Sequence, residues 1–255
     1  MDPSFLNLPP RAPKPRGSGL THVLDKGMPP DAVAALLDIV GDQVDVWKFG
    51  WGTAYVDRGL DRKVRCLRAH DITSCLGGTL LEIAWSQGKG DECLAWAARV
   101  GFDAVEVSRG VASMTLYDKR ELIKRASETF VVLAETGVKD ARVVMSAQQW
   151  RDEIAEDLAA GAAWIITEGR ESGTVGVYDA SGSPRPDIID AAVHAAGLER
   201  VLFEAPRKDQ QAWLINRFGP EVNLGNIALD DVLPLTTLRL GLRADTASLT
   251  LGRQR

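Results

Sequence analysis

The chain has 255 residues, of which 45% are hydrophobic and 25% are charged, an ordinary balance for a globular protein. This length suits one large α/β domain or two small ones. The formal net charge of −5 argues against a nucleic-acid surface as the main partner, and no apolar run approaches the roughly 18 residues of a membrane span.

The first 19 residues are rich in proline and basic side chains and lack the apolar block of a signal peptide. Such a composition predicts an extended arm over the protein surface. The cysteines are odd in number and lack metal-type spacing, which favours reduced thiols and a cytoplasmic location. They are Cys66, Cys75 and Cys93.

Eight short runs of apolar and β-branched residues predict strands that are covered on both faces. Each run ends in polar residues or glycine. The runs are LTHVLDKG (20–27), VDVWKFG (44–50), ITSCLGG (72–78), FDAVEVS (102–108), FVVLAETG (130–137), AWIITEG (163–169), RVLFEAP (200–206) and VNLGNI (222–227).

Helical patterns lie between these runs. The first, residues 29–41, begins with prolines that a first helical turn tolerates and ends at Gly41. The pattern at 90–101 closes with Gly101, which is typical of a C-terminal cap. The other helical patterns span residues 55–70, 116–129, 146–161, 186–197, 208–219 and 230–243.

A strand followed by a helix, eight times in about 250 residues, is typical of a (β/α)8 TIM barrel. A doubly wound parallel sheet is the alternative, because alternation by itself does not decide whether the sheet closes. The count of eight favours the barrel. We therefore predict one catalytic barrel domain over residues 20–246, preceded by the arm at 1–19 and followed by a tail at 247–255.

In such barrels the active site is built at the C-terminal ends of the strands. Lys48 interrupts a strand there, and burial of an unpaired ammonium is costly. We expect Lys48 to point into a polar mouth, with Gly50 and Gly52 letting the backbone turn close to a ligand. A solvated surface lysine is the alternative. The seven tryptophans are spread over helices and strands, which favours packing roles for them.

Four glutamates fall within or at the ends of the apolar runs of four consecutive strands: Glu106, Glu135, Glu168 and Glu204. Burial without a partner would be penalised, and convergent carboxylates suit Mg²⁺, which prefers oxygen ligands and keeps several waters. We predict that Glu106, Glu168 and Glu204 bind the metal and that Glu135 is catalytic. The alternative is that some of them form ion pairs with Lys48, Arg170 or Lys139.

Two later segments predict an anion site. In EGRESG (168–173), the planar guanidinium of Arg170 matches a phosphate or carboxylate, and Ser172 and Gly173 can present donors beside it. A tight turn with an ion-paired arginine is the alternative. Asn226 belongs to the last strand run, a common phosphate region in these barrels, although its neighbouring amides equally suit structural turn bonds.

Several motifs in this order resemble the phosphosulfolactate synthase family: KPRGSGLTHVLDKG, VDVWKFGWGT, GGTLLE, EGRESG, FEAPRKDQQ, and VNLGNI followed by TLRLGLRADT. The resemblance spans about residues 13–246. It implies a (β/α)8 barrel that uses Mg²⁺ to add sulfite to phosphoenolpyruvate, giving (2R)-phospho-3-sulfolactate. It also implies a homo-oligomer and a step like the first one of coenzyme M biosynthesis.

In that chemistry, Lys139 or Lys48 with a lowered pKa is a candidate to protonate the carbon beside the new C–S bond. Arg170 and Lys26 are candidates to hold the substrate's phosphate or carboxylate.

Three positions that we expect to face the site differ from the family pattern: Arg109 replaces an acid, Val138 a lysine and Thr236 a glutamate. Two alternatives therefore stay open. One is a divergent member that acts on phosphoenolpyruvate or a related carboxylate with another nucleophile or reaction. The other is a non-catalytic stress-related binding protein.

Overall fold

The computed structural model describes residues 5–138, 143 and 145–251. Eight parallel strands close into a barrel in chain order, because β1 pairs with both β2 and β8. The predicted TIM barrel is confirmed and the doubly wound sheet is excluded. The strands are β1 (Thr21–Asp25), β2 (Val46–Phe49), β3 (Thr73–Leu76), β4 (Ala104–Val107), β5 (Val131–Thr136), β6 (Trp164–Thr167), β7 (Val201–Glu204) and β8 (Leu224–Ile227).

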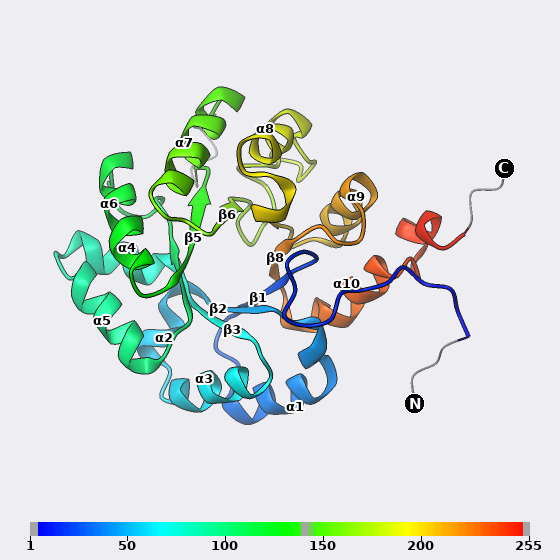
Figure 1. The fold of residues 1–255 in the computed structure, drawn as a ribbon, viewed down its shortest axis with the longest axis horizontal. Coiled ribbons are helices and arrows are strands. Elements are labelled where there is room, and N and C mark those ends of the chain that lie inside the picture. Colours follow the sequence, from blue (N-terminus) through cyan, green and yellow to red (C-terminus); the bar gives the residue numbers. More distant parts are fainter. Residues whose placement is uncertain (1–4, 139–142, 144, 252–255) are drawn as a thin grey trace.

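Helices surround the strands on the outside (Figure 1). In the described part of the chain, no helix has the length and apolar character needed to cross a bilayer. The helices are α1 (Pro30–Val40), α2 (Thr53–Val56), α3 (Leu60–Ala69), α4 (Gly78–Ser86), α5 (Gly90–Val100), α6 (Leu116–Ser127), α7 (Ala147–Ala159), α8 (Pro186–Ala196), α9 (Lys208–Phe218) and α10 (Val232–Arg239).

Among the helices of eight or more residues that the structure describes, α4 is the one that the sequence patterns did not predict. Two glycines, Gly77 and Gly78, mark its start and are typical of a turn. The helix nevertheless begins at Gly78, because a tertiary contact satisfies its first amide: the carboxylate of Glu106 on β4 accepts the Gly78 N–H at 3.1 Å.

The interior of the barrel is built in two layers, since side chains alternate along a strand and every second residue points inward. The lower layer is apolar and buried and consists of Val46, Cys75, Ala104, Leu133, Ile166 and Leu202. The side chain two positions later on five of these strands is charged: Lys48, Glu106, Glu135, Glu168 and Glu204. Strand alternation alone therefore places a charged layer above an apolar floor.

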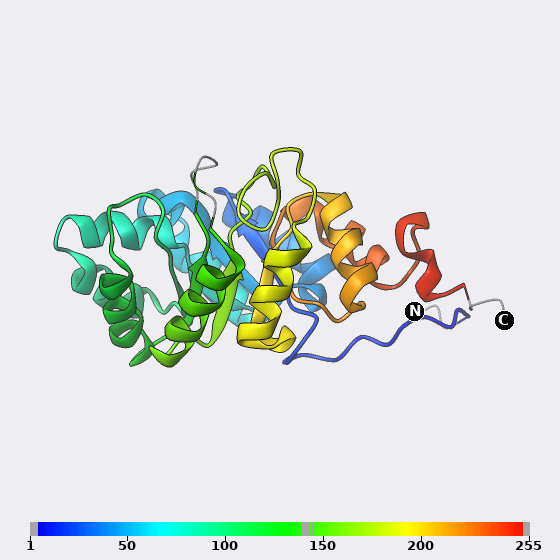
Figure 2. The ribbon, with the colours of Figure 1, turned by 90° about the horizontal axis from the view of Figure 1, so that it is seen from above.

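The described residues before β1 cross the end of the barrel opposite this charged layer. The guanidinium of Arg16 lies 2.6 Å from Oδ1 of Asp45, and Oδ2 of Asp45 accepts the Thr21 N–H at 2.9 Å. Lys14 donates to the His70 carbonyl at 3.0 Å. The first and the last described residues lie on the same side of the molecule (Figure 2).

Candidate active site

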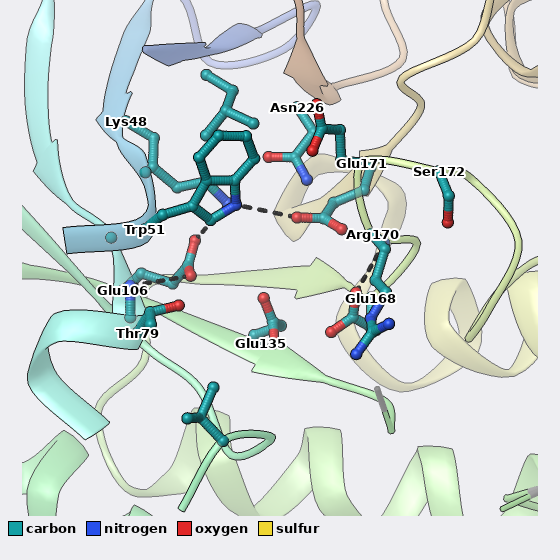
Figure 3. Close-up of a pocket in the computed structure, with 16 residues that line it drawn as sticks. Lys48, Trp51, Thr79, Glu106, Glu135, Glu168, Arg170, Glu171, Ser172 and Asn226 are labelled. Atoms are coloured by element: carbon teal, nitrogen blue, oxygen red, sulfur yellow. Dashed lines mark hydrogen bonds and ion pairs between the residues drawn. The ribbon is translucent and has the colours of Figure 1, made fainter. Parts of the chain in front are cut away.

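A cavity of about 460 Å³ opens at the C-terminal ends of the strands. The side chains of Lys48, Glu106 and Glu135 point into it from three different strands (Figure 3). The described residues that line it are Leu24, Lys48, Gly50, Trp51, Gly77, Gly78, Thr79, Glu106, Val111, Glu135, Glu168, Arg170, Glu171, Ser172, Glu204 and Asn226.

Lys48 lies between two glutamates in this cavity. Its Nζ is 2.9 Å from Glu106 Oε2 and 3.4 Å from Glu204 Oε1. Burial lowers the pKa of Lys48, but the charges of Glu106, Glu204 and Glu135 outweigh burial, and the net pKa is raised above its ordinary value. The expectation of a lowered pKa for Lys48 is therefore wrong. Lys48 stays an ammonium across the physiological pH range.

The second oxygen of each of these two glutamates accepts a backbone amide. Glu106 Oε1 accepts the Gly78 N–H at 3.1 Å, and Glu204 Oε2 accepts the Gly169 N–H at 2.9 Å. Each carboxylate thus joins Lys48 to the loop of the preceding strand. Such bonds offset the desolvation of two carboxylates that are 4% and 1% exposed.

The carboxyl group of Glu204 has a raised pKa. Burial is the largest cause, and the like charges of Glu135 and Glu106 add to it, while Lys48 acts in the opposite direction. The resulting pKa is about 7. The site therefore concentrates negative charge to the point where one carboxyl group takes up a proton near neutral pH.

Glu168 and Arg170 form the opposite side of the cavity. Glu168 is buried, and its Oε1 accepts the Arg170 N–H at 2.7 Å. Arg170 is exposed and has φ of 57°, a left-handed conformation that this hydrogen bond helps to hold. Figure 3 shows both side chains at the edge of the cavity.

The charges of the cavity lining suit a divalent cation. Among the described lining residues, five are glutamates and two are cationic, Lys48 and Arg170. No three His, Cys, Asp or Glu side chains of the described residues form a ready-made metal cage. Mg²⁺ does not need one, because it commonly uses one or two carboxylates together with water and substrate oxygens. The carboxylates present therefore fit a Mg²⁺ ion whose ligands are oxygens of the protein, water and substrate together.

Lys26 and Glu171 meet at the rim of the cavity. Lys26 Nζ forms an ion pair with Glu171 Oε1 and lies 5.2 Å from the centroid of the Trp51 ring. Trp51 is 53% exposed and lines the cavity, so a packing role for this tryptophan is wrong. Its position between two glycines was the signal available in the sequence. In the structure Trp51 has φ of 52°, a left-handed conformation that is uncommon for a bulky residue.

The three other predicted binding residues have different surroundings. Ser172 is exposed and lines the cavity, whereas Gly173 is buried, is not among the lining residues, and its carbonyl accepts from Gln210 Nε2 at 2.8 Å. Asn226 lines the cavity, is 8% exposed, and its Oδ1 has no hydrogen-bond partner among the described residues. The Asn226 N–H donates to Nδ1 of His22 at 3.3 Å, a contact that the scattered histidines of the sequence did not predict.

Lys139 lies outside the described residues. Arg109, Val138 and Thr236, the three positions that depart from the family pattern, do not line this cavity. Arg109 lies 3.7 Å from Glu153 on the outer helix layer, and Val138 lines a separate cavity of about 350 Å³. Thr236 donates to a carbonyl of its own helix at 3.0 Å. The described structure therefore does not support the expectation that these positions face the site.

A sequence model of the (2R)-phospho-3-sulfolactate synthase family matches residues 9–245. The chain belongs to this family. Phosphosulfolactate synthase of Bacillus subtilis is 41% identical over 253 residues, which cover 96% of this chain and 99% of the relative. Phosphosulfolactate synthase of Methanocaldococcus jannaschii is 44% identical over 234 residues, which cover 89% of this chain and 93% of the relative. The resemblance inferred from the motifs is confirmed.

Solved structures of other barrels are similar in fold. 3-Hexulose-6-phosphate synthase from Salmonella typhimurium has a TM-score of 0.57 at 12% identity, covering 91% of this chain and 98% of that one. Another 3-hexulose-6-phosphate synthase has a TM-score of 0.54 at 17% identity, covering 86% and 97%. At these identities the likeness shows the barrel fold alone.

The motifs of the phosphosulfolactate synthase family supply most of the cavity. VDVWKFGWGT contributes Lys48 and Trp51, GGTLLE contributes the start of α4, and EGRESG contributes Glu168 and Arg170. Membership of this family makes the chain a lyase-type enzyme that forms a C–S bond. The family motifs and the cavity therefore coincide in space.

Proposed function

We propose that the protein catalyses the Mg²⁺-dependent addition of sulfite to phosphoenolpyruvate, giving (2R)-phospho-3-sulfolactate. The observation that carries this proposal is the placement of Lys48 between Glu106 and Glu204 at the mouth of a barrel whose sequence belongs to the phosphosulfolactate synthase family. A permanently charged ammonium at the centre of the cavity suits a reaction in which negative charge develops on a small carboxylate.

In the proposed reaction the sulfur lone pair of sulfite forms a bond to the methylene carbon of phosphoenolpyruvate. The electrons of the carbon–carbon double bond move onto the carboxylate, which becomes an enediolate. A proton then adds to the carbon that carries the phosphate ester, and that ester stays intact. Lys48 would stabilise the enediolate, because its raised pKa keeps it charged throughout.

The other predicted residues take supporting roles in this proposal. Lys139 is the proposed proton donor. Arg170 and Lys26 would bind the phosphate, with Ser172 and Asn226 as further hydrogen-bonding groups at the same rim. Glu135 belongs to the catalytic group because its charge contributes to the raised pKa of Lys48.

We propose that one or two of the carboxylates predicted as metal ligands, Glu106, Glu168 and Glu204, hold Mg²⁺ together with water and substrate oxygens. All three are buried carboxylates on the charged layer of the barrel. Glu106 and Glu204 would share their oxygens between the metal and Lys48, because both already contact its ammonium. When bound, the ion would act as a Lewis acid toward the substrate carboxylate.

The proposal extends to a homo-oligomer in the cytoplasm. All three cysteines are free, which suits a reducing compartment. Light scattering coupled to size exclusion would measure the number of subunits.

The test is an incubation of the purified protein with phosphoenolpyruvate, sulfite and Mg²⁺, followed by ³¹P NMR. We expect phosphosulfolactate to form, and its formation to stop with EDTA and in Lys48→Met. Lys89→Met, at an exposed ion pair with Glu92, is the matched control and should retain activity. Bound phosphoenolpyruvate without product would instead indicate a different nucleophile or reaction. Absence of binding would indicate a non-catalytic protein.

A further inference from the structure

Glu82 on α4 is a buried carboxylate that the proposed reaction does not use. It is 1% exposed, and its Oε2 accepts three consecutive backbone amides. The N–H groups of Gly110, Val111 and Ala112 lie 2.9, 2.6 and 3.0 Å from this oxygen. Consecutive amides that converge on one point form an anion-binding concavity, and here the anion belongs to the protein itself.

The other oxygen of Glu82 completes the attachment of the same loop. Oε1 accepts the hydroxyl hydrogen of Ser108, the first residue after β4. The loop between β4 and α6 is thus held at four points by one side chain of the neighbouring βα unit. Hydrogen bonds to an ionised acceptor are roughly twice as strong as those between neutral groups, so the charge of Glu82 matters for this hold.

The loop that Glu82 holds forms part of the substrate cavity. Val111 lines the cavity and is 57% exposed. The start of this loop packs closely against the start of α4, because a Cβ added to Gly78 would lie 2.3 Å from Ser108 Oγ and 2.9 Å from Glu106 Oε1. The start of α4, the carboxylate of Glu106 and the loop therefore occupy one packed corner of the mouth.

We propose that Glu82 is a positioning residue that holds Val111 in place as the apolar wall of the substrate cavity. Glu82 is not one of the lining residues, so it acts through the loop rather than on the substrate. The inference rests on the proposed function for the identity of the substrate. It gives a structural role to Glu82, the last residue of the GGTLLE motif, which has no role in the proposed reaction at Lys48.

The kinetic test is a double-mutant cycle between Glu82 and Val111. Loss of one apolar contact between an enzyme and its substrate typically weakens the interaction about tenfold or more. Glu82→Ala and Val111→Ala should therefore each raise KM for phosphoenolpyruvate by about tenfold. We expect kcat to stay within about threefold, because Lys48 is untouched. The double variant should have the KM of either single variant, since both lose the same wall.

Two further variants separate positioning from general stability. Glu82→Gln keeps an oxygen for the three amides but lacks the charge, so its KM should be intermediate. Asp45→Asn is the matched control, because Asp45 is a buried carboxylate that accepts a backbone amide at the opposite end of the barrel. It should lower the melting temperature without changing KM.

Hydrogen exchange measures how strongly Glu82 protects the loop amides, independently of turnover. In Glu82→Ala the amides of residues 110–112 should exchange about 10–100-fold faster, while those in Asp45→Asn should not change. An unchanged KM in Glu82→Ala, a multiplicative double variant, or unchanged exchange at these amides would each overturn the inference. Absence of product from the wild-type protein would refute the proposed function instead, and the exchange comparison would still decide whether Glu82 holds the loop.

Discussion

Lys48 and Glu106 form an ion pair of 2.9 Å in which the two side chains are only 7% and 5% exposed. The residues are 58 positions apart in the chain and come from strands β2 and β4. Desolvation of a buried pair offsets much of its attraction, so the pair is weak evidence for stability. Its consequence is geometric: the ammonium is fixed at the centre of the cavity.

Replacement of Lys48 tests this consequence. Lys48→Met keeps the shape of the side chain but leaves Glu106 and Glu204 without their cation. We expect turnover to fall about 100–1000-fold, as for removal of a group that stabilises developing negative charge. The free energy of unfolding at neutral pH should fall by about 3–5 kcal/mol, because buried carboxylates lose their partner. Wild-type turnover in this variant would remove Lys48 from the mechanism.

Lys63 provides a stability test away from the cavity. Its side chain is 1% exposed, and its Nζ lies 2.9 Å from Asp25 and 2.7 Å from Asp57. Lys63→Met should lower the free energy of unfolding by about 3–5 kcal/mol. Lys89→Met should leave the free energy of unfolding nearly unchanged, because the Lys89–Glu92 pair is 63% and 61% exposed. Urea denaturation measures both, and equal effects would contradict the argument from burial.

The rim pair of Lys26 and Glu171 predicts opposite effects of two substitutions. Both side chains are about half exposed, at 43% and 50%, so either change should alter stability by less than about 1 kcal/mol. Lys26→Ala should raise KM for phosphoenolpyruvate about tenfold and reduce its salt dependence. Glu171→Gln should lower KM, because Lys26 loses its competing anion. Steady-state kinetics at two salt concentrations measures both effects. A rise of KM in both variants would contradict the predicted competition between Glu171 and the substrate for Lys26.

The raised pKa of Glu204 predicts how stability depends on pH in the metal-free protein. The folded pKa of about 7 lies above the ordinary value of 4.5, so the folded state holds a proton that the unfolded state has released. The contribution of Glu204 to stability is therefore fully present below about pH 4.5 and is lost as pH rises through about 7. Glu204→Gln should lack this decline.

Urea denaturation in EDTA, at a series of pH values from about 4.5 to 8, measures the difference between Glu204→Gln and the wild-type protein. Titrating groups that lie away from the cavity are common to both proteins and cancel in the comparison. Parallel curves for the two proteins would show that Glu204 titrates at its ordinary pKa.

The sequence predicted the barrel well because its signals are local. Each strand was an apolar run with a polar end, and eight such runs with helices between them left little choice of fold. Helix α4 escaped prediction because two glycines open it, and the group that accepts its first amide is Glu106, 28 residues away in the chain. A pattern of neighbouring residues cannot indicate a contact between residues that are 28 positions apart.

The charged layer was likewise within reach of the sequence, since the inward direction repeats every second residue and Lys48, Glu135 and Glu168 obey it. The alternative that some of these glutamates pair with Lys48 is confirmed for Glu106 and Glu204, but the sequence did not indicate which glutamates would do so. Closure of the sheet brings Lys48 to Glu204 across 156 residues, and the packing of α4 beside β4 brings Glu82 to the loop that carries Val111. Sequence therefore determined the fold, the family and which charged residues at the strand ends face the mouth, because alternation and motifs are properties of short segments. Only the tertiary structure decided which charges neutralise one another, because distances across a barrel depend on the register and closure of all eight strands.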